Sequence, residues 1–554
     1  MGKRSDELSV GVERAAHRAL LYSTGMLEED FKKPMVAVVN SWNEIVPGHA
    51  HLRDISEAVK QGVLEAGGIP KEFNTIAVCD GMCQGHVGMR YPLPSREVIA
   101  DSIEIMVESH RFDAMVMIPG CDKITPGMIM AALRINIPTI LVTAGPMMTG
   151  HYKNISVITT ADIRECAGKV QVGEISRDEL SKMERAAMPT LGTCSMMGTA
   201  NTMSCLAEVL GLTLPGCATA MAVSAEKKRL AKRSGIRVME LYRDNLTPRK
   251  IVTRQALEDA IAASMAMGGS TNSVLHLMAF AHEAGIRLEL NDFDRISRKV
   301  PYICNIKPSG QYALADLNEA GGIPALLKTI EPLLAPEHLT VTGKQLKENI
   351  QEVVPPENDV IYPLKAPKRP EGGIAVLYGN LAPDGAVVKQ AGVKPSMHVF
   401  KGRARVFSSM EEAADAISGD RIRAGDVIVI RYEGPKGGPG MREMHMVTSL
   451  LVGRGMDESC ALITDGRFSG STRGPCIGHI SPEAAAGGPI AIVEDGDEIS
   501  IDIPGRRLEL LVPEAEIRKR LEQVTLMQKP RPGVLGKYAQ LVTSADKGAV
   551  LLYE

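Results

Sequence analysis

Residues 114–143 run AMVMIPGCDKITPGMIMAALRINIPTILVT and contain a strand, a loop, a helix and a second strand in succession. Ala114–Ile118 and Pro138–Thr143 are short apolar runs typical of buried strands, and Pro34–Asn40 is a third. Thr125-Pro126 places a proline in the first helical turn, where its missing N–H is not needed. This alternation predicts an α/β domain with a mainly parallel sheet.

The loops that leave these strands carry reactive side chains. In parallel α/β sheets, ligands bind outside the carboxyl ends of the strands. The loop at Cys121 follows one predicted strand, and the loop at Asp80 follows the apolar run Thr75–Val78. We therefore expect both loops at the same edge of the sheet, where a functional site would lie.

A change of composition after residue 350 predicts a second domain. Residues 355–373 are rich in proline, glycine and charge, which is typical of a boundary. We expect an N-terminal α/β domain over 1–360, a linker over 361–372 and a C-terminal β-barrel-like, swivelling β/α domain over 373–554. Short β-rich runs between glycine-rich turns indicate the barrel; they are Val427–Tyr432, Ala461–Thr464, Ile490–Val493 and Ile499–Ile503.

Composition limits the function classes. The 554 residues include 63 Lys and Arg against 66 Asp and Glu, and the net charge of −3 disfavours nucleic-acid binding through a basic surface. No apolar run is long enough to predict a membrane-spanning helix. The N-terminal residues lack the apolar segment of a secretory signal, so the ten cysteines are expected to be reduced thiols. We expect a cytoplasmic protein, or one of an organelle matrix.

Three cysteine-containing turns could bind metal. Cys79-Asp-Gly-Met-Cys-Gln places thiols beside Asp80, although a simple turn capped by that aspartate is the alternative. Gly120-Cys-Asp-Lys123 puts three reactive side chains before a helix N-terminus, which favours a thiolate and carboxylates. Cys194 lies in a glycine-rich turn of its own. If Cys121 and Cys194 meet in space, they form a soft-ligand site for an iron–sulfur cluster or zinc.

Two motifs in the second half offer oxygen ligands and a hydroxyl. Glu433-Gly-Pro-Lys-Gly-Gly-Pro-Gly-Met-Arg-Glu443 could form an anion-binding nest of backbone N–H groups, or a flexible surface loop. Glu433 and Glu443 are candidate ligands for a hard metal ion. In Asp465-Gly-Arg-Phe-Ser-Gly470, the Ser469 hydroxyl can carry a proton only beside a cation that lowers its pKa. A polar turn is the alternative there.

Two further patterns have ordinary structural alternatives. His49-Ala-His51 could bind a metal, but Pro47-Gly48 indicates a turn, in which these two side chains would not share a face. Gly268-Gly-Ser-Thr-Asn272 precedes a predicted helix whose N-terminus could hold an anion or simply be capped. The cysteines outside the motifs are expected to pack in the core; they are Cys166, Cys205, Cys217, Cys304, Cys460 and Cys476.

As a set, the motifs resemble the dihydroxy-acid dehydratase family, within the dihydroxy-acid and 6-phosphogluconate dehydratase superfamily. The resembling segments extend over almost the whole chain; they are Arg90-Tyr-Pro-Leu-Pro-Ser-Arg-Glu, Gly120-Cys-Asp-Lys-Ile-Thr-Pro-Gly, Gly268-Gly-Ser-Thr-Asn, Arg431-Tyr-Glu-Gly-Pro-Lys-Gly-Gly-Pro-Gly-Met, Asp465-Gly-Arg-Phe-Ser-Gly and Leu541-Val-Thr-Ser-Ala-Asp-Lys-Gly. The resemblance implies a hydro-lyase that removes water from 2,3-dihydroxy carboxylates in valine and isoleucine synthesis. It also implies a three-layer α/β domain followed by a β-barrel-like domain.

The resemblance implies a role for single residues as well. The implied set is Cys121 and Cys194 for an iron–sulfur cluster, Asp80, Asp122 and Glu443 with an N-carboxylated Lys123 for Mg²⁺, and Ser469 as general base. Members with a three-cysteine [2Fe-2S] site carry a cysteine where this chain has Gly48. One expected ligand is therefore missing, Cys79 is a candidate third ligand, and [4Fe-4S] is the alternative to [2Fe-2S].

Two other functions are kept as alternatives. A sugar-acid dehydratase of the same superfamily, acting on 6-phosphogluconate or an aldonate, would share the cysteine and aspartate motifs. An iron–sulfur redox or sensor protein would leave Asp80, Asp122, Glu443 and Ser469 without a role. We expect small-molecule substrates, no nucleic acid or membrane partner, and a homodimer as the resemblance implies.

Overall fold

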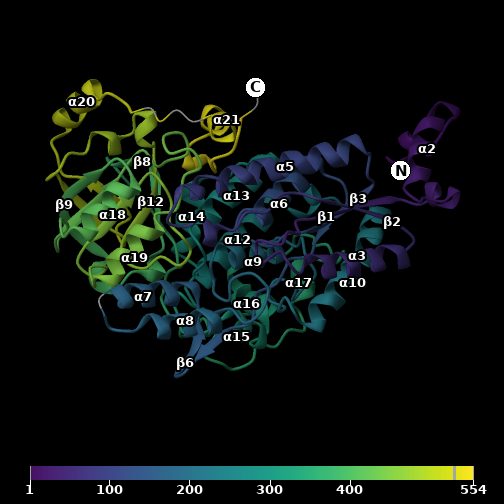
Figure 1. Ribbon diagram of the computed structural model, residues 1–554, viewed down its shortest axis with the longest axis horizontal. Coiled ribbons are helices and arrows are strands. Elements are labelled where there is room, and N and C mark those ends of the chain that lie inside the picture. Colours follow the sequence, from purple (N-terminus) through teal and green to yellow (C-terminus); the bar gives the residue numbers. More distant parts are fainter. Residues whose placement is uncertain (1, 172, 528, 530–531, 553–554) are drawn as a thin grey trace.

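Four parallel strands form the sheet of the N-terminal half in the computed structural model, which describes residues 2–171, 173–527, 529 and 532–552 (Figure 1). The strands lie in the order β2-β1-β3-β4, and neighbouring strands are parallel. Their bounds are β1 Met35–Asn40, β2 Ile69–Asn74, β3 Ala114–Ile118 and β4 Thr139–Leu141. The strands expected at 34–40, 114–118 and 138–143 are confirmed, the last in a shorter form.

Helices cover this sheet, as a three-layer arrangement requires. α3 (Leu52–Glu65) and α10 (Ala225–Asp244) pack against each other and against the strands. Figure 1 shows α5 (Pro92–Ser109) and α6 (Ile124–Ile135) on the opposite side. β1 and β3 are buried along their whole length, because helices cover both faces of a parallel sheet. The expected α/β fold is confirmed.

Three further helices continue the core toward the second half of the chain. They are α9 (Thr199–Val209), α12 (Arg254–Met267) and α13 (Asn272–Ala284). Every residue of α9 is buried, and α13 is buried from Asn272 to Ala281. α9 begins directly after the Cys194 turn, and α13 begins at the end of the Gly268–Asn272 motif. Both motifs therefore lie at buried helix N-termini.

Eight strands of the second half close into a barrel, in the order β10-β11-β12-β8-β7-β14-β13-β9. They are β7 Ala375–Gly379, β8 Ala382–Val388, β9 Val399–Phe407, β10 Asp426–Ile430, β11 Ala461–Thr464, β12 Cys476–Ser481, β13 Glu498–Asp502 and β14 Arg507–Leu510. Val427 and Val429 belong to one apolar cluster, whereas Ile428 and Ile430 pack with α18 (Met410–Ser418) and α19 (His445–Gly453) in another. After Asp426, every residue of β10 is apolar, because both faces of this strand are covered. The expected barrel-like domain is confirmed.

One expected β run is wrong. Ile490–Val493 overlaps a 3-10 helix that spans Pro489–Ile492. Pro489 occupies the first helical position, where its fixed φ favours a helical turn, and its missing N–H could not have joined a strand ladder. Ile490, Ala491 and Ile492 are nonetheless buried, so the apolar pattern reflects burial rather than extended backbone.

Two segments connect the barrel with the α/β domain. Residues 361–372, expected as a linker, pass along the α/β domain, where the Tyr302 N–H donates to the carbonyl oxygens of Arg369 and Glu371. Near the end of the described chain, α21 (Val534–Leu541) returns to the α/β domain (Figure 1). A mixed apolar cluster forms there from Leu93, Leu275, Met441, Tyr538, Val542, Ala545 and Ala549.

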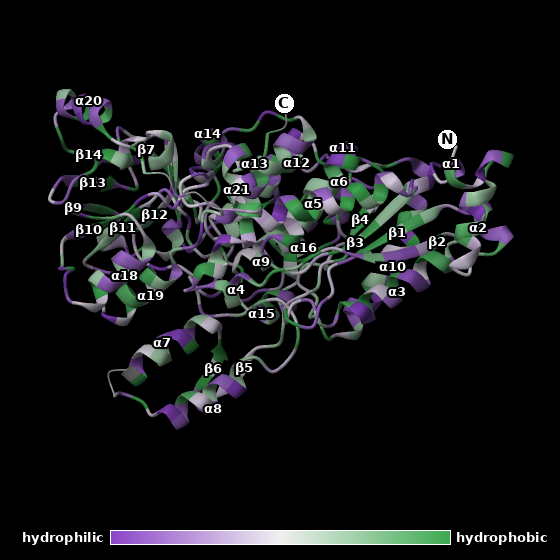
Figure 2. Ribbon diagram, turned by 45° about the horizontal axis from the view of Figure 1, so that its top comes forward, coloured by the Kyte–Doolittle hydropathy of each residue, from purple (hydrophilic) through white to green (hydrophobic). Residues whose placement is uncertain are grey.

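A small lobe projects beside the body of the molecule (Figure 2). It consists of β5 (Gly150–Tyr152), β6 (Ile155–Ile158), α7 (Thr160–Gln171) and α8 (Arg177–Ala187). α7 packs against α19, so the lobe also contacts the barrel side. In the part of the chain that the structure describes, no helix is both long and apolar enough to cross a bilayer.

Candidate active site

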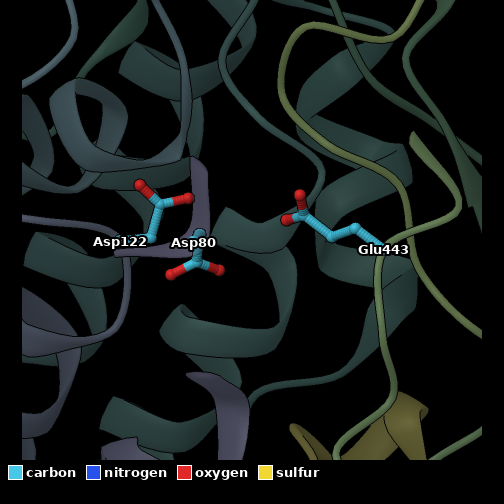
Figure 3. A group of neighbouring side chains, drawn as sticks. All are labelled: Asp80, Asp122 and Glu443. Atoms are coloured by element: carbon cyan, nitrogen blue, oxygen red, sulfur yellow. The ribbon is translucent and has the colours of Figure 1, made fainter. Parts of the chain in front are cut away.

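Three carboxylates from distant parts of the chain meet between the α/β domain and the barrel. Asp80, Asp122 and Glu443 each offer an oxygen, and these oxygens lie within 4.8 Å of one another. Asp80 begins α4 (Asp80–Cys83) and Asp122 lies between β3 and α6. Figure 3 shows Glu443, from the loop before α19, pointing at the two aspartates from the opposite side. The group is an acidic site of the kind that holds a metal ion.

Two buried cations lie against these carboxylates. Lys123 Nζ is 3.0 Å from Asp80 Oδ2 and 3.8 Å from Asp122 Oδ2. Arg467 Nη1 is 2.5 Å from Glu443 Oε1, and its Nη2 is 3.6 Å from Asp80 Oδ2. Neither cationic side chain is exposed, so their positive charges offset those of the carboxylates away from solvent. Three ionised carboxylates would still exceed two cations by one negative charge.

Two amides fix the orientation of Glu443. Asn272 Nδ2 donates to Glu443 Oε1 at 3.1 Å, and Gln84 Nε2 donates to Glu443 Oε2 at 3.1 Å. Asn272 is the first residue of α13, so the Gly268–Asn272 motif meets a carboxylate of the chain itself at this helix N-terminus. Sequence reasoning assigned no role to Gln84 or Arg467, although both lie inside motifs that it singled out.

The donor set fits a hard cation. Asp80 Oδ1 is buried and has no hydrogen-bond partner among the described residues. Burial, followed by the charge of Asp80, raises the pKa of Asp122 to about 7. The pKa of Asp122 is raised because burial and a neighbouring negative charge both disfavour the ionised form. Carboxylate oxygens are the ligands that Mg²⁺ prefers, so an added Mg²⁺ would relieve this repulsion.

A cavity of about 280 Å³ adjoins the carboxylates and is lined by Cys79, Cys121 and Cys194. Asp80 and Asp122 line the same cavity. Burial raises the pKa of the Cys121 thiol well above its usual range and that of Cys194 to about 12. Both thiols therefore keep their protons at neutral pH, and a bound metal must displace these protons and offset the cost of forming the thiolates.

The three thiols do not form a compact site for one ion. Apart from the carboxylates, no three His, Cys, Asp or Glu of the described chain have ligand atoms all within 4.8 Å. Sulfurs around a cavity suit an iron–sulfur cluster, whose irons take separate thiolates, better than they suit zinc. Of the cysteines expected in the core, Cys166 on α7 is half-buried and the other five are buried.

His49 and Gly120 hold the Cys121 loop in place. His49 Nε2 accepts a hydrogen bond from the Cys121 backbone N–H at 2.9 Å, and its Nδ1 lies 2.8 Å from the Ser41 carbonyl oxygen. Burial lowers the pKa of His49 to about 4, which keeps the ring neutral for this acceptor role. A Cβ at Gly120 would lie 2.6 Å from His49 Nε2. In this arrangement His49 positions a loop instead of binding metal.

Ser469 lies next to the hydrogen bonds that orient Glu443. Its half-buried hydroxyl is 3.0 Å from the Ser471 hydroxyl. The carbonyl oxygen of its neighbour Phe468 accepts a hydrogen bond from Asn272 Nδ2 at 3.2 Å, and the same amide nitrogen binds Glu443. Asn272 thus links the serine loop to the carboxylate group.

The glycine-rich loop forms the expected nest of backbone N–H groups, but it supplies only one of the two expected metal ligands. Glu433 forms a buried ion pair with Arg442 and stands apart from the carboxylate group, so only Glu443 of the two candidate ligands joins it. The loop N–H groups of Lys436 and Gly437 donate to the Glu483 carboxylate at 2.8 and 2.7 Å. The anion in this nest is therefore a side chain of the protein, which sequence spacing could not reveal.

Comparison with known proteins identifies the family. A model described as dihydroxy-acid/6-phosphogluconate dehydratase N-terminal matches residues 33–349, and its C-terminal counterpart matches residues 359–549. The chain belongs to the dihydroxy-acid/6-phosphogluconate dehydratase family. A protein named dihydroxy-acid dehydratase from Ignicoccus hospitalis is 54% identical to it over 100% of each chain. A protein of the same name from Aquifex aeolicus is 51% identical to it over 99% of each chain. A third, from Methanothermobacter thermautotrophicus, is 51% identical over 99% of this chain and 100% of its own.

The two matched segments of this dehydratase family divide the candidate site. Asp80, Asp122 and the three cavity cysteines lie in the N-terminal match, and Glu443 and Ser469 lie in the C-terminal match. The acidic group is therefore complete only when the two segments pack together.

Proposed function

We propose that this family member is a dihydroxy-acid dehydratase. The full-length similarity to proteins of that name carries the proposal. The proposed substrates are (2R)-2,3-dihydroxy-3-methylbutanoate and (2R,3R)-2,3-dihydroxy-3-methylpentanoate. Loss of water gives the 2-oxo acids that lead to valine and isoleucine, so the chain is a hydro-lyase of branched-chain amino-acid synthesis.

Asp80, Asp122 and Glu443 are the proposed Mg²⁺ ligands, together with an N-carboxylated Lys123. Two observations support this assignment: the three carboxylates lie close together, and Asp80 Oδ1 has no hydrogen-bond partner in the described part of the chain. Lys123 Nζ lies 3.0 Å from Asp80, so a carboxyl group added to this nitrogen would offer another oxygen at the same place. Oxygen-only coordination is typical of Mg²⁺.

Cys121 and Cys194 are the proposed ligands of an iron–sulfur cluster in the adjoining cavity. The cluster is [2Fe-2S] by the family resemblance, with [4Fe-4S] as the alternative because Gly48 replaces a cysteine. When bound, the iron would act as a Lewis acid toward the leaving C3 hydroxyl and Mg²⁺ would offset negative charge on the substrate carboxylate and C2 oxygen.

Ser469 is the proposed general base. An ordinary hydroxyl is too weakly basic to remove a proton from C2, so Ser469 must act as an alkoxide beside positive charge. Asn272 holds both the adjacent Phe468 carbonyl and Glu443, which keeps the serine loop next to the cation site. Once C2 has lost its proton and C3 its hydroxyl, the enol product becomes the 2-oxo acid by tautomerisation.

The proposal is tested with protein purified without oxygen. Iron, sulfide and Mg²⁺ are counted, and 2-oxo acid formation is measured from 2,3-dihydroxy-3-methylbutanoate, 6-phosphogluconate and an aldonate. We expect turnover of the branched acid. Turnover of only a sugar acid would favour the second branch of the family, and a redox-active cluster without any dehydration would favour a sensor.

The assembly and compartment are part of the proposal. We propose a cytoplasmic homodimer that acts on small molecules, in line with the family resemblance. Light scattering coupled to size-exclusion chromatography measures the dimer directly.

A further inference from the structure

We propose that Cys79 is the third protein ligand of the cluster, in place of a cysteine at position 48. This inference rests on the proposed function, because it assumes that the cavity holds an iron–sulfur cluster. It concerns how this chain, with Gly48, completes the ligand set.

The cavity wall brings the three thiols together from three different loops. Cys79 ends the segment between β2 and α4, Cys121 follows β3, and Cys194 precedes α9. All three line the same cavity of about 280 Å³, and Gly48 lines it with them. Cys83, four residues after Cys79, is not part of the lining. The structure thus distinguishes two cysteines that the sequence places in one motif.

Position 48 belongs to the same wall. A Cβ built on Gly48 would lie 2.8 Å from Cys121 Sγ, so a side chain at position 48 would lie beside this thiol and would require the Cys121 side chain to shift. Without that side chain, Cys79 is the only thiol besides Cys121 and Cys194 among the described residues that line the cavity. Each thiol binds iron after losing its proton, so no redox step is involved.

Hydrogen bonds fix the turn that carries Cys79, and a cation lies beside it. The backbone N–H groups of Met82 and Cys83 donate to the Cys79 carbonyl oxygen at 3.2 and 3.1 Å. Arg164 Nη2 donates to the Gly81 carbonyl oxygen at 3.2 Å, which places a guanidinium beside the thiols. This cation reduces the cost of gathering several thiolates.

Three ligands also leave the cluster with an open position. Both [2Fe-2S] and [4Fe-4S] clusters take four protein thiolates when fully ligated. Cys79, Cys121 and Cys194 would therefore leave one position without a protein ligand. A dehydratase needs such a position, because the substrate hydroxyl must reach iron.

The first test compares Cys79→Ser with Cys83→Ser, both purified without oxygen beside the wild type. Iron and sulfide per chain and the visible absorption spectrum are measured, with circular dichroism to check folding. We expect Cys79→Ser to lose the cluster on desalting and Cys83→Ser to keep it. An unchanged cluster in Cys79→Ser contradicts the proposal, whereas a wild type without iron and sulfide contradicts the proposed function itself.

A second measurement needs no substitution. Native wild type is alkylated with iodoacetamide before and after the cluster is removed, and modified cysteines are identified by mass spectrometry. We expect Cys79, Cys121 and Cys194 to be protected only while the cluster is present, and half-buried Cys83 to react similarly in both states. Equal alkylation of Cys79 with and without the cluster would overturn the assignment.

A rescue variant tests whether a thiol at position 48 can replace the thiol of Cys79 in this cavity. Adding Gly48→Cys to Cys79→Ser restores a thiol to the same cavity. We expect this double variant to regain iron and sulfide. A folded double variant that stays without a cluster would contradict the view that positions 48 and 79 serve one cluster.

Discussion

At the scale of single residues, one buried arginine holds carboxylates from both halves of the chain. Arg467 contacts both Asp80 and Glu443, and its Nε donates to the Met441 carbonyl oxygen at 2.7 Å. The guanidinium is planar and has several fixed donors, so it can hold two carboxylates and a backbone oxygen at once. It therefore sets the distance between carboxylates of the two halves of the chain before any metal ion binds.

Ser469→Ala should lower kcat by about 10²- to 10⁴-fold, the usual contribution of a general base. Iron, sulfide and Mg²⁺ content should not change, because Ser469 is not a proposed ligand. Steady-state kinetics and metal analysis on the same preparation check both expectations.

Ser471→Ala is the matched control, since its hydroxyl lies 3.0 Å from that of Ser469. We expect this variant to lose much less activity than Ser469→Ala. Near-normal turnover by Ser469→Ala would remove Ser469 as the base.

At the scale of elements, the glycine-rich loop before α19 is held by buried acids. Asp465 accepts hydrogen bonds from the backbone N–H groups of Tyr432, Glu433 and Ala484. Glu483 accepts two more from the same loop. The loop carries Glu443 at its end, so these internal acids help to place a proposed metal ligand.

Glu483→Gln should change how stability depends on pH. Burial, followed by the charge of Asp465, raises the pKa of Glu483 from 4.5 to about 7. A pKa that is raised in the folded state stabilises the protein below the unfolded pKa, and this contribution is lost as pH rises through the folded pKa. Between pH 5 and pH 8, the free energy of unfolding of the wild type should thus fall by on the order of 1–3 kcal/mol through this group. Glu483→Gln should not show this fall.

Thermal unfolding of both proteins at pH 5 and pH 8 measures this difference. Exposed Glu357→Gln is the control and should follow the wild type at both pH values. Parallel pH dependence of Glu483→Gln and the wild type would show that Glu483 does not titrate in this range.

At the scale of the whole molecule, Arg506 joins the barrel to the α/β domain. Its Nε is 2.7 Å from Asp294 Oδ1 on α14 (Leu290–Ser297), and its Nη2 is 2.6 Å from Glu371 Oε2 in the segment between the two halves. The arginine side chain is only 4% exposed, so water screens its attraction to the two carboxylates less than it would at the surface.

Arg506→Met should destabilise the protein by about 1–3 kcal/mol, because two carboxylates lose a partner near the interface. kcat/KM should also fall, since the site needs Asp80 and Asp122 from one half and Glu443 and Ser469 from the other. Thermal unfolding and steady-state kinetics measure the two effects.

Arg507→Met removes the neighbouring arginine, whose side chain is 67% exposed and pairs with Asp502 within the β13–β14 hairpin. We expect little change in either quantity, because an exposed pair contributes little. Equal effects of the two substitutions would contradict a specific role for Arg506 at the interface.

The sequence by itself determined the fold class and the chemistry of the motifs. Apolar runs such as Ala114–Ile118 predict buried segments because hydrophobicity belongs to the side chains themselves, and their length and flanking residues favour strands. The residue types of Cys121 and Asp122 indicate soft and hard ligands for the same reason, since donor chemistry belongs to the side chain. At Pro489–Ile492 an apolar run was buried without being a strand, because burial and backbone conformation are separate properties.

Only the tertiary structure decided which of these residues meet. Glu443 lies more than three hundred residues from Asp122, and nothing local distinguishes it from Glu433, which pairs with Arg442 instead. Likewise, Cys79 lines the cavity and Cys83 does not, although the two are only four positions apart in the sequence. Such contacts depend on how the barrel packs on the sheet, and long-range packing carries no signal in residue spacing. The physical reason is that side-chain chemistry is local, whereas the geometry of a shared site is set by the whole fold.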